Sequence, residues 1–311
     1  MNKKKSLIIG SGVLGAYLAC ELLKNDHKII VTSRRKRIIY KNYNFLNIGN
    51  RVKFEKLDIK KKSEIKKIIE KHSPNFIYYF AGQSSLTKSY KLKKETYESH
   101  FIGTKNFLEV IKKLKLNIKF FKANSGYIFK PIKGIISLDC KLSSSNNPYI
   151  KSQKKTFKLI KNYRNFNLLL YSLIFLQIES PLRNKDFFIK KVCFHAKNKK
   201  KIAVGNVDTI RDYSWAQDIA KSIYYLSKLP PRDIILSSGI GISGREILDI
   251  AYRQKRLNYK KFFRVDKKLV RKNEDEILIG KQNNTNILMK KFKFKFSTFG
   301  SKLIKKMYNQ K

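Results

Sequence analysis

Acidic residues are scarce in this sequence. The 311 residues include 22 Asp and Glu against 70 Lys and Arg, which gives a formal net charge of +48. Such an excess suggests a phosphate-bearing partner such as nucleic acid. The lysines, however, are spread along the whole chain together with many Ile, Asn, Phe and Tyr residues, a pattern typical of compositional bias. We therefore interpret most of the charge as a solvated surface and expect no specific nucleic-acid partner.

Cysteines and long apolar runs are also scarce. Cys20, Cys140 and Cys193 show no CxxC or Cys/His spacing, which excludes a disulfide framework and predicts no metal site. The longest apolar run, 168–178, is far shorter than the roughly 20 residues that cross a bilayer. The lysine-rich start and apolar residues 7–23 imitate an export signal, but the glycines within them have a better explanation. We expect a cytoplasmic protein without membrane contact.

The chain nevertheless has the composition of a folded protein. Its 42% hydrophobic and 13% aromatic residues exclude a disordered basic tail. A chain of about 300 residues also buries enough surface to fold without disulfide or metal staples. The length suggests two domains or one large α/β unit.

Short apolar strands alternate with amphipathic helices in the first half of the chain. Strands separated by helices predict an α/β fold with a doubly wound parallel sheet. From 176 to about 207 the sequence is basic and irregular, and no element is expected there. The expected strands are 6–9, 27–32, 52–57, 75–80, 118–122, 168–175 and 234–236, and the expected helices are 13–24, 61–71, 104–115, 215–226 and 243–253.

A glycine motif joins the first expected strand to the first helix. Gly10, Gly12 and Gly15 form GxGxxG in the strand–turn–helix context of a dinucleotide-binding, Rossmann-type loop. The first glycine permits the turn, the second admits the pyrophosphate, and the third lets helix and strand pack closely. The helix N-terminus then faces the phosphates. Val13 and Leu14 in this loop are further candidates for cofactor contact.

The second expected strand ends in arginine rather than in an acid. An NAD site carries Asp or Glu there to hold the ribose 2′-hydroxyl, whereas Arg34 and Arg35 suit a 2′-phosphate. The pattern favours NADP over NAD, with ordinary surface charge as the alternative for both arginines. Asp58 and Ile59 follow the third strand and are candidates for contact with the adenine, although a surface turn explains Asp58 equally well.

Small polar segments follow the fourth and fifth expected strands. In open α/β sheets, ligands bind at the carboxyl ends of the strands, so these segments belong to the same candidate site. A helix then begins at Asn147-Pro148. The candidate residues in these segments are Ala81, Gly82, Gln83, Ser84, Ser125 and Tyr149.

Together these motifs resemble the extended short-chain dehydrogenase/reductase family, and most closely its GDP-mannose 4,6-dehydratases. The resemblance covers most of the chain and rests on 82–84, 179–183, 205–213, 243–246 and 269–271. It implies an NADP-binding domain over 1–175 and a smaller C-terminal α/β lobe, mainly 176–311, that binds a GDP-linked sugar. Part of that lobe, about 208–240, is expected to return to the first domain. The resemblance also implies a homodimer or homotetramer.

The resemblance implies an internal hydride shuttle. The hexose is oxidised at C4, water is lost across C5 and C6, and the hydride returns to C6. Tyr149 is then the base and Ser125 the hydroxyl beside it. The implied contacts to cofactor are Gln153 and Arg183, and those to the nucleotide sugar are Ser84, Glu179, Arg211 and Arg271.

Three residues depart from the pattern of the family. Gln153 occupies the position of the lysine that lowers the tyrosine pKa, and Lys154 lies roughly 140° round the helix from Tyr149. Tyr127 occupies the position of the dehydratase glutamate, and Ile178 that of a histidine. The missing glutamate is compatible with a reductase or an epimerase. Loss of the lysine weakens any chemistry at Tyr149, so a cofactor-binding relative without turnover is a third alternative.

Overall fold

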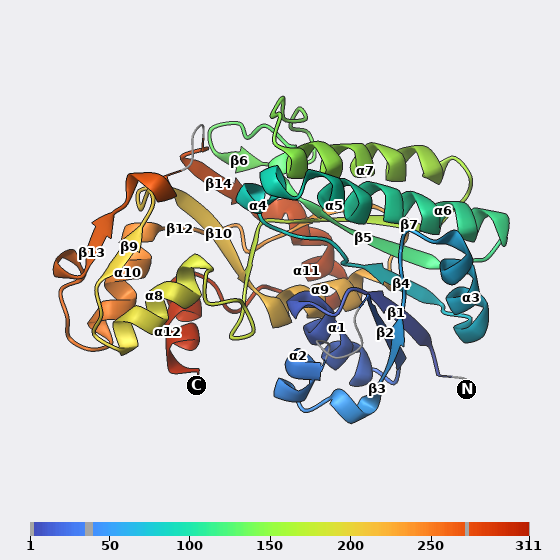
Figure 1. Cartoon of the computed structure of the whole chain (residues 1–311), viewed down its shortest axis with the longest axis horizontal. Helices are drawn as coiled ribbons and strands as arrows, with labels where there is room; N and C mark the ends of the chain where they lie inside the picture. Colours follow the sequence, from blue (N-terminus) through green and yellow to red (C-terminus); the bar gives the residue numbers. More distant parts are fainter. Residues whose placement is uncertain (1–2, 35–39, 271–273, 311) are drawn as a thin grey trace. The chain divides into compact units, whose positions relative to one another are not determined.

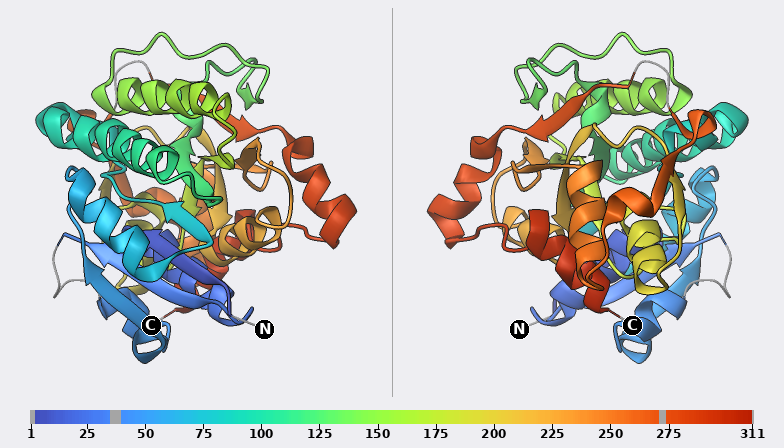
Figure 2. Two further views of the ribbon diagram at one scale, coloured as in Figure 1. Left: turned by 90° about the vertical axis from the view of Figure 1, so that its right-hand side faces the viewer. Right: turned by 90° about the vertical axis from the view of Figure 1, so that its left-hand side faces the viewer.

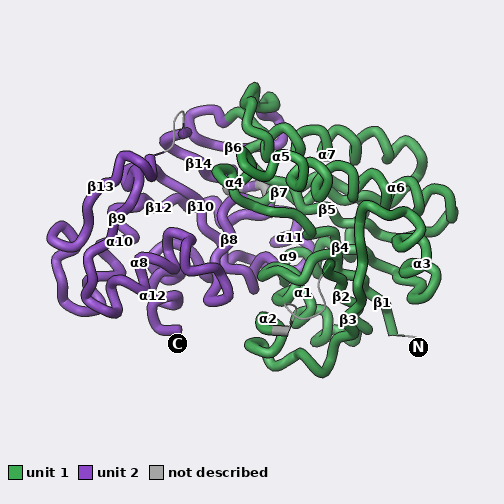
Figure 3. Tube along the Cα trace, viewed as in Figure 1, with its two compact units in different colours: residues 1–130, 141–175, 220–235 green, residues 131–140, 176–219, 236–311 purple. Residues whose placement is uncertain are grey.

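The computed structural model describes residues 3–34, 40–270 and 274–310. The chain divides into two compact units (Figure 3). Unit 1 contains residues 1–130, 141–175 and 220–235, and unit 2 contains residues 131–140, 176–219 and 236–311. Each unit has its own sheet and its own buried core, and the two are described separately below.

Unit 1 is built on a seven-stranded sheet in the order β11-β7-β5-β4-β1-β2-β3. The pairs from β7 to β3 are all parallel. Strand β7 is buried along its whole length, as expected for a strand covered on both faces. The strands are β1 Lys5–Ile9, β2 Lys28–Ser33, β3 Val52–Lys56, β4 Phe76–Tyr79, β5 Lys119–Ser125, β7 Leu170–Phe175 and β11 Asp233–Leu236.

Helices cover both faces of this sheet. Apolar residues of α3, α6 and α7 pack on one face, while α1 and the end of α9 lie on the other (Figure 1). Helices α6 and α7 run side by side (Figures 1 and 2). The helices of unit 1 are α1 Val13–Leu23, α2 Tyr40–Phe45, α3 Lys62–His72, α4 Leu86–Lys91, α5 Lys93–Tyr97, α6 Gly103–Lys113 and α7 Pro148–Arg164, and α9 Ala216–Leu226 begins in unit 2 and ends in unit 1.

The chain reverses its direction across the sheet between β1 and β4, which are adjacent although a long segment separates them in sequence. Such a switch point opens a crevice at the carboxyl ends of the strands, where α/β sheets bind their ligands. The loops after β1, β2, β4 and β5 all leave the sheet at that edge. The fold thus gathers the candidate motifs of the first half of the chain.

Unit 2 is smaller and mixed. Its larger sheet has the order β12-β10-β14-β6, with β8 beside β10, and a second pair joins β13 to β9. Helices α8, α10 and α12 share one apolar cluster around Ile189, Ile247 and Leu303. The elements are β6 Ile135–Ile136, β8 Gln177–Glu179, α8 Phe188–Lys197, β9 Ile202–Val204, β10 Ile210–Trp215, β12 Gly241–Ser243, α10 Gly244–Arg253, β13 Phe263–Val265, β14 Ile277–Gly280, α11 Asn286–Phe292 and α12 Gly300–Asn309.

The expected fold class, a doubly wound parallel sheet, is confirmed. The expectation of irregular structure over 176–207 is wrong, because β8, α8 and β9 lie there. In α8 the buried residues Ile189, Val192, Cys193 and Ala196 follow the helical spacing i, i+3, i+4, i+7. In the sequence, lysines that belong to the other face of the helix separate these apolar residues, and this obscured the stripe.

Candidate functional site

The glycine loop has the geometry that its spacing predicts. Gly10 has a φ of +104°, and a Cβ there would lie 2.8 Å from the backbone nitrogen of Ala81. A Cβ on Gly15 would lie 2.5 Å from the Gly10 carbonyl oxygen. A Cβ on Gly12 would meet nothing within 4 Å. Gly10 and Gly15 are therefore required by the protein itself, whereas the space beside Gly12 is open.

Helix α1 begins directly behind this open space. Gly12 is its N-cap and provides no side-chain cap, and the first turn contains no acidic residue. The first N–H groups of the helix thus have no side-chain acceptor at the cap, an arrangement that suits a phosphate. Val13 and Leu14, both half-buried, form this first turn. The loop fits the pyrophosphate of a dinucleotide.

The turn after β4 is built around a histidine. Gly82 has a φ of +135°, and a Cβ there would lie 2.3 Å from the His100 ring. His100 lies in a π-helical turn, Glu98–Ile102, between α5 and α6, and its Nε2 lies 2.8 Å from the Gln83 carbonyl oxygen. The Gln83 side chain bonds Thr96 and the backbone N–H of Ser85. It braces the loop internally, and Ser84 is exposed.

Tyr149 lies in the first turn of α7. Asn147 caps this helix through bonds from the backbone N–H groups of Tyr149 and Ile150, at 2.9 and 3.3 Å, and Pro148 follows the cap. Proline in the first turn and asparagine at the cap both favour a helix start at this point. The Tyr149 ring is buried and meets the His100 ring edge-on, with centroids 5.3 Å apart.

Gln153 lies one turn further along α7 and faces the same histidine. Its Nε2 is 3.4 Å from His100 Nδ1, and its Oε1 has no hydrogen-bond partner among the described residues. Lys154 instead donates to the Ser143 carbonyl, and Lys151 is exposed. The structure thus brings Gly82, Tyr149 and Gln153 together around His100.

Ser125 ends β5 and is buried. Its Oγ accepts the backbone N–H of Tyr127 at 3.3 Å, which caps the short helical turn Gly126–Ile128. That turn packs against α7, the helix that contains Tyr149. Tyr127 is half-buried in the turn.

The residues predicted to contact the cofactor after β2, β3 and β4 form local contacts within unit 1. Arg34 forms a 2.8 Å ion pair with Glu95 of α5 and is 65% exposed, whereas Arg35 lies outside the described residues. Asp58 Oδ1 accepts the backbone N–H of Lys60 in the turn after β3, and Ile59 is buried. Ala81 is half-buried against Gly10 at the end of β4.

Two of the residues predicted in unit 2 to bind ligand, Arg211 and Arg183, contact other residues of the same unit. Arg211 is 5% exposed and bonds the carbonyls of Asp275 and Glu276, and it pairs with the Glu274 carboxylate at 2.9 Å. Its guanidinium therefore braces the segment before β14. The Arg183 guanidinium stacks on Phe187 at 3.3 Å. Arg271 lies outside the described residues.

Glu179, at the end of β8, is 2% exposed, and its Oε2 has no hydrogen-bond partner among the described residues. Burial raises its pKa to about 7, although Arg183, Lys190 and the Ser180 N–H act in the opposite direction. The folded chain thus favours the protonated form. The contribution of this group to the free energy of unfolding is largest below pH 4.5, the ordinary pKa of a glutamate. It is lost as the pH rises from there to about 7.

Replacing Glu179 with glutamine, which resembles the protonated acid, tests the direction of this pH dependence. We expect Glu179→Gln to be about 3 kcal/mol more stable than the wild type at pH 8 and to differ from it by less than ~1 kcal/mol at pH 5. Denaturant unfolding at the two pH values measures the difference. Glu70→Gln, an exposed change on α3, serves as the control. A stability gain that is equal at both pH values would contradict the argument.

His100 is a candidate site residue that the sequence does not indicate. His100 belongs to no motif and has no metal-ligand spacing in the sequence, yet its ring contacts the Gly82 loop, Tyr149 and Gln153. Its backbone carbonyl also accepts bonds from Thr104 and Thr156, which tie the π-turn to α6 and α7. No local pattern indicates these contacts, although π-turns are frequent at functional sites.

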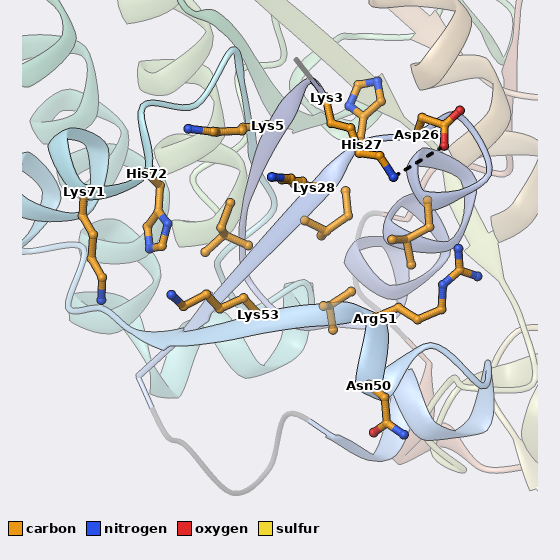
Figure 4. A pocket seen from close by; sticks show the side chains of 14 residues that line it. Lys3, Lys5, Asp26, His27, Lys28, Asn50, Arg51, Lys53, Lys71 and His72 are labelled. Atoms are coloured by element: carbon orange, nitrogen blue, oxygen red, sulfur yellow. Dashed lines mark ion pairs between the residues drawn. The ribbon is translucent and has the colours of Figure 1, made fainter. Parts of the chain in front are cut away.

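The basic charge also gathers away from the glycine loop. A pocket of about 690 Å³ lies at the amino ends of β1, β2 and β3, the edge opposite the candidate site. Lys5 and Lys28 are neighbours in register there, with Lys53 on the next strand (Figure 4). None of the predicted site residues lines the pocket.

Over the described ranges there is no cluster of metal-binding side chains and no helix long and apolar enough to span a bilayer.

Known proteins share both the sequence and the fold. The family profile described as GDP-mannose 4,6 dehydratase matches residues 7–307. The GDP-mannose 4,6-dehydratase of Vibrio cholerae is 26% identical over 272 residues, 82% of this chain and 72% of that protein. The GDP-mannose 4,6 dehydratase of Drosophila melanogaster is 26% identical over 306 residues, 92% of this chain and 74% of that protein.

Among solved structures, the dTDP-glucose 4,6-dehydratase from Bacillus anthracis in complex with NAD superposes with a TM-score of 0.83. It is 16% identical, over 98% of this chain and 95% of that chain. The fold and the sequence matches define an extended short-chain dehydrogenase/reductase of the nucleotide-sugar dehydratase and epimerase group. Within that class, the chain belongs to the GDP-mannose 4,6-dehydratase family.

Proposed function

We propose that the chain is a nucleotide-sugar 4,6-dehydratase that acts on GDP-mannose with NADP as its cofactor. One observation carries the proposal: Tyr149 is buried in the capped first turn of α7, against His100, with Gln153 one turn further along. A tyrosine so held serves as the base for a sugar hydroxyl. Residues 1–175 would hold the cofactor, and residues 176–311 would mainly recognise the nucleotide sugar.

The cofactor would be held by the glycine loop and by the turns after β2, β3 and β4. The open space at Gly12 and the uncapped start of α1 fit a pyrophosphate. When bound, the nicotinamide supplies reversible hydride transfer. The residues proposed to contact it are Gly10, Gly12, Val13, Leu14, Gly15, Arg34, Arg35, Asp58, Ile59, Ala81, Gly82, Gln83, Gln153 and Arg183.

The protein's own groups orient the sugar and move its protons. Tyr149 would accept the proton of the sugar hydroxyl, with Ser125 sharing the hydrogen bond. The Asn147 cap fixes the position of the tyrosine backbone, and burial of the ring keeps water away from the phenol. The residues proposed to contact the nucleotide sugar are Ser84, Glu179, Arg211 and Arg271.

A reductase or epimerase acting on a related keto-sugar is the second candidate. Tyr127 occupies the position where a dehydratase has the glutamate that handles the proton at C5. A phenol, with an ordinary pKa near 10, is a poor substitute for a carboxylate as a base. Tyr127 is therefore the observation that favours a reductase or an epimerase over a dehydratase.

Incubation of the purified protein with GDP-mannose and NADP tests the proposal. A dehydratase forms the 4-keto-6-deoxy sugar, which mass spectrometry detects as the loss of one water. An isomer of unchanged mass would indicate an epimerase, and NADPH consumption with a 4-keto-6-deoxy sugar would indicate a reductase. If NADP binds but no substrate is converted, the dehydratase proposal fails and a cofactor-binding relative without turnover remains.

The NADP preference has its own test at the end of β2. Arg34→Ala is expected to lower affinity for NADP about tenfold while leaving NAD binding unchanged, since a charged bond to the 2′-phosphate is lost. Glu95→Gln is expected to strengthen NADP binding, because it releases Arg34 from its ion pair. Titration calorimetry with both dinucleotides measures the ratio. An equal loss of both affinities in Arg34→Ala would remove the cofactor argument.

A further inference from the structure

The pocket at the amino ends of β1, β2 and β3 is lined by lysines that share one face of the sheet. Lys5 of β1 and Lys28 of β2 are partners in register. Ile30 lies two residues beyond Lys28 on β2 and is the partner of Lys53 on β3. Side chains alternate between the two faces along a strand, and register partners share a face. Lys5, Lys28 and Lys53 therefore form a row of like charges across three neighbouring strands (Figure 4).

Carboxylates neutralise only one end of this row. Glu55 lies two residues beyond Lys53 on β3 and pairs with it at 3.7 Å, and with Lys71 of α3 at 2.9 Å. Within the part of the chain that the structure describes, neither Lys5 nor Lys28 forms an ion pair. Two ammonium groups thus stand side by side with no counter-charge from the protein.

Protection of a sheet edge does not explain these two lysines. Lysine on an edge strand hinders association with another edge, which accounts for Lys53, because β3 is the last strand of the sheet. Lys5 and Lys28 lie on the interior strands β1 and β2, where no edge needs protection. Like charges at opposed positions of neighbouring strands lower the stability of the sheet. An anion bound between them would remove this repulsion.

The size of the pocket indicates the kind of anion. Its volume of about 690 Å³ lies within the range of roughly 300–1,000 Å³ that small-molecule sites have. The row of lysines extends over two strand spacings, or about 10 Å. A single phosphate is too small to contact all three ammonium groups, whereas two or three linked phosphates match the length of the row. Arg51, in the turn before β3, also lines the pocket.

We propose that this pocket is a second phosphate site, which binds a small polyphosphate chain, either free or as the phosphate tail of a nucleotide. Lys5 and Lys28 would donate charged hydrogen bonds to the phosphate oxygens, and Lys53 and Arg51 would contact the other end of the chain. The pocket contains no residue of the glycine loop and lies at the opposite edge of the sheet. The inference therefore does not depend on the proposed function.

Titration of the full-length protein with inorganic triphosphate tests the proposal. In calorimetry at about 0.15 M salt, triphosphate should bind at least tenfold more tightly than orthophosphate, because the longer anion contacts more ammonium groups. Combining Lys5→Gln with Lys28→Gln should weaken triphosphate binding about 100-fold, since two charged hydrogen bonds are lost. Equal affinities for the two anions, no triphosphate binding by the wild type, or wild-type affinity in the double variant would each overturn the proposal.

Two control variants separate this pocket from the general basic surface and from the glycine loop. Lys302→Gln with Lys305→Gln removes the same charge from exposed positions on α12 and should leave triphosphate affinity within threefold of the wild type. Gly12→Ala should also leave it within threefold. A 100-fold loss in the α12 variant would assign the binding to the basic surface as a whole, and such a loss in Gly12→Ala would assign it to the glycine loop. Either result would overturn the proposal.

Thermal unfolding checks the repulsion between the two lysines. Without ligand, the variant that combines Lys5→Gln with Lys28→Gln should have a Tm no lower than that of the wild type, because a pair of like charges has been removed. Triphosphate should raise the Tm of the wild type and not that of this variant. A lower Tm in the unliganded variant would contradict the argument from repulsion.

Two further probes identify the source of the phosphates. An affinity for ATP more than tenfold above that for inorganic triphosphate would support a nucleotide as the ligand, and equal affinities would support the phosphate chain alone. A single-stranded oligonucleotide that binds through Lys5 and Lys28 without competition from triphosphate would overturn the proposal in favour of a nucleic-acid surface.

Discussion

Tyr149→Phe is expected to lower kcat about 1000-fold and to leave cofactor affinity within threefold. General acid–base groups contribute roughly 10²- to 10⁴-fold to catalysis, and phenylalanine cannot exchange a proton. The substitution preserves the fold, because Asn147 caps α7 through backbone N–H groups and the ring that meets His100 remains. Steady-state kinetics with GDP-mannose and a dinucleotide titration measure the two quantities.

The matched control for this variant lies on the same helix. Tyr163→Phe, near the end of α7, changes a half-buried tyrosine that packs on Phe166, away from His100. Its kcat should remain within twofold of the wild type. If Tyr149→Phe retained more than a tenth of wild-type turnover, Tyr149 would not be the base.

Gly12→Ala is expected to weaken cofactor binding about 100-fold, or ~3 kcal/mol, with little change in stability. A Cβ at this position meets no protein atom within 4 Å, and the Gly12 φ of −69° suits alanine. The methyl group would instead occupy the space proposed for the pyrophosphate. Loss of affinity without loss of Tm would therefore locate the ligand at this loop.

Gly15→Ala provides the contrast. Its Cβ would lie 2.5 Å from the Gly10 carbonyl oxygen, so this change should lower Tm as well as affinity. Thermal unfolding and dinucleotide titration of both variants separate the two effects. Undiminished binding by Gly12→Ala would contradict the proposed path of the cofactor.

The elements of unit 1 were predictable because their signals are local. The GxGxxG spacing, the apolar strands and the Asn147-Pro148 helix start each depend on neighbours in sequence, and each appears in the structure. In unit 2, α8 and α12 were missed because lysines interrupt their apolar stripes. The buried face of α12, with Leu303, Ile304 and Met307, has the same helical spacing.

The sequence by itself determined the doubly wound fold, the glycine loop and the loss of a lysine at position 153. Only the tertiary structure decided what surrounds Tyr149 and where Lys122 lies. Strand β5 was expected to end at Lys122 but runs on to Ser125, which places the lysine in the interior. His100 reaches the Tyr149 ring from a π-turn before α6. Contacts between separate elements depend on how the helices pack on the sheet, and the spacing of residues along one element does not indicate them.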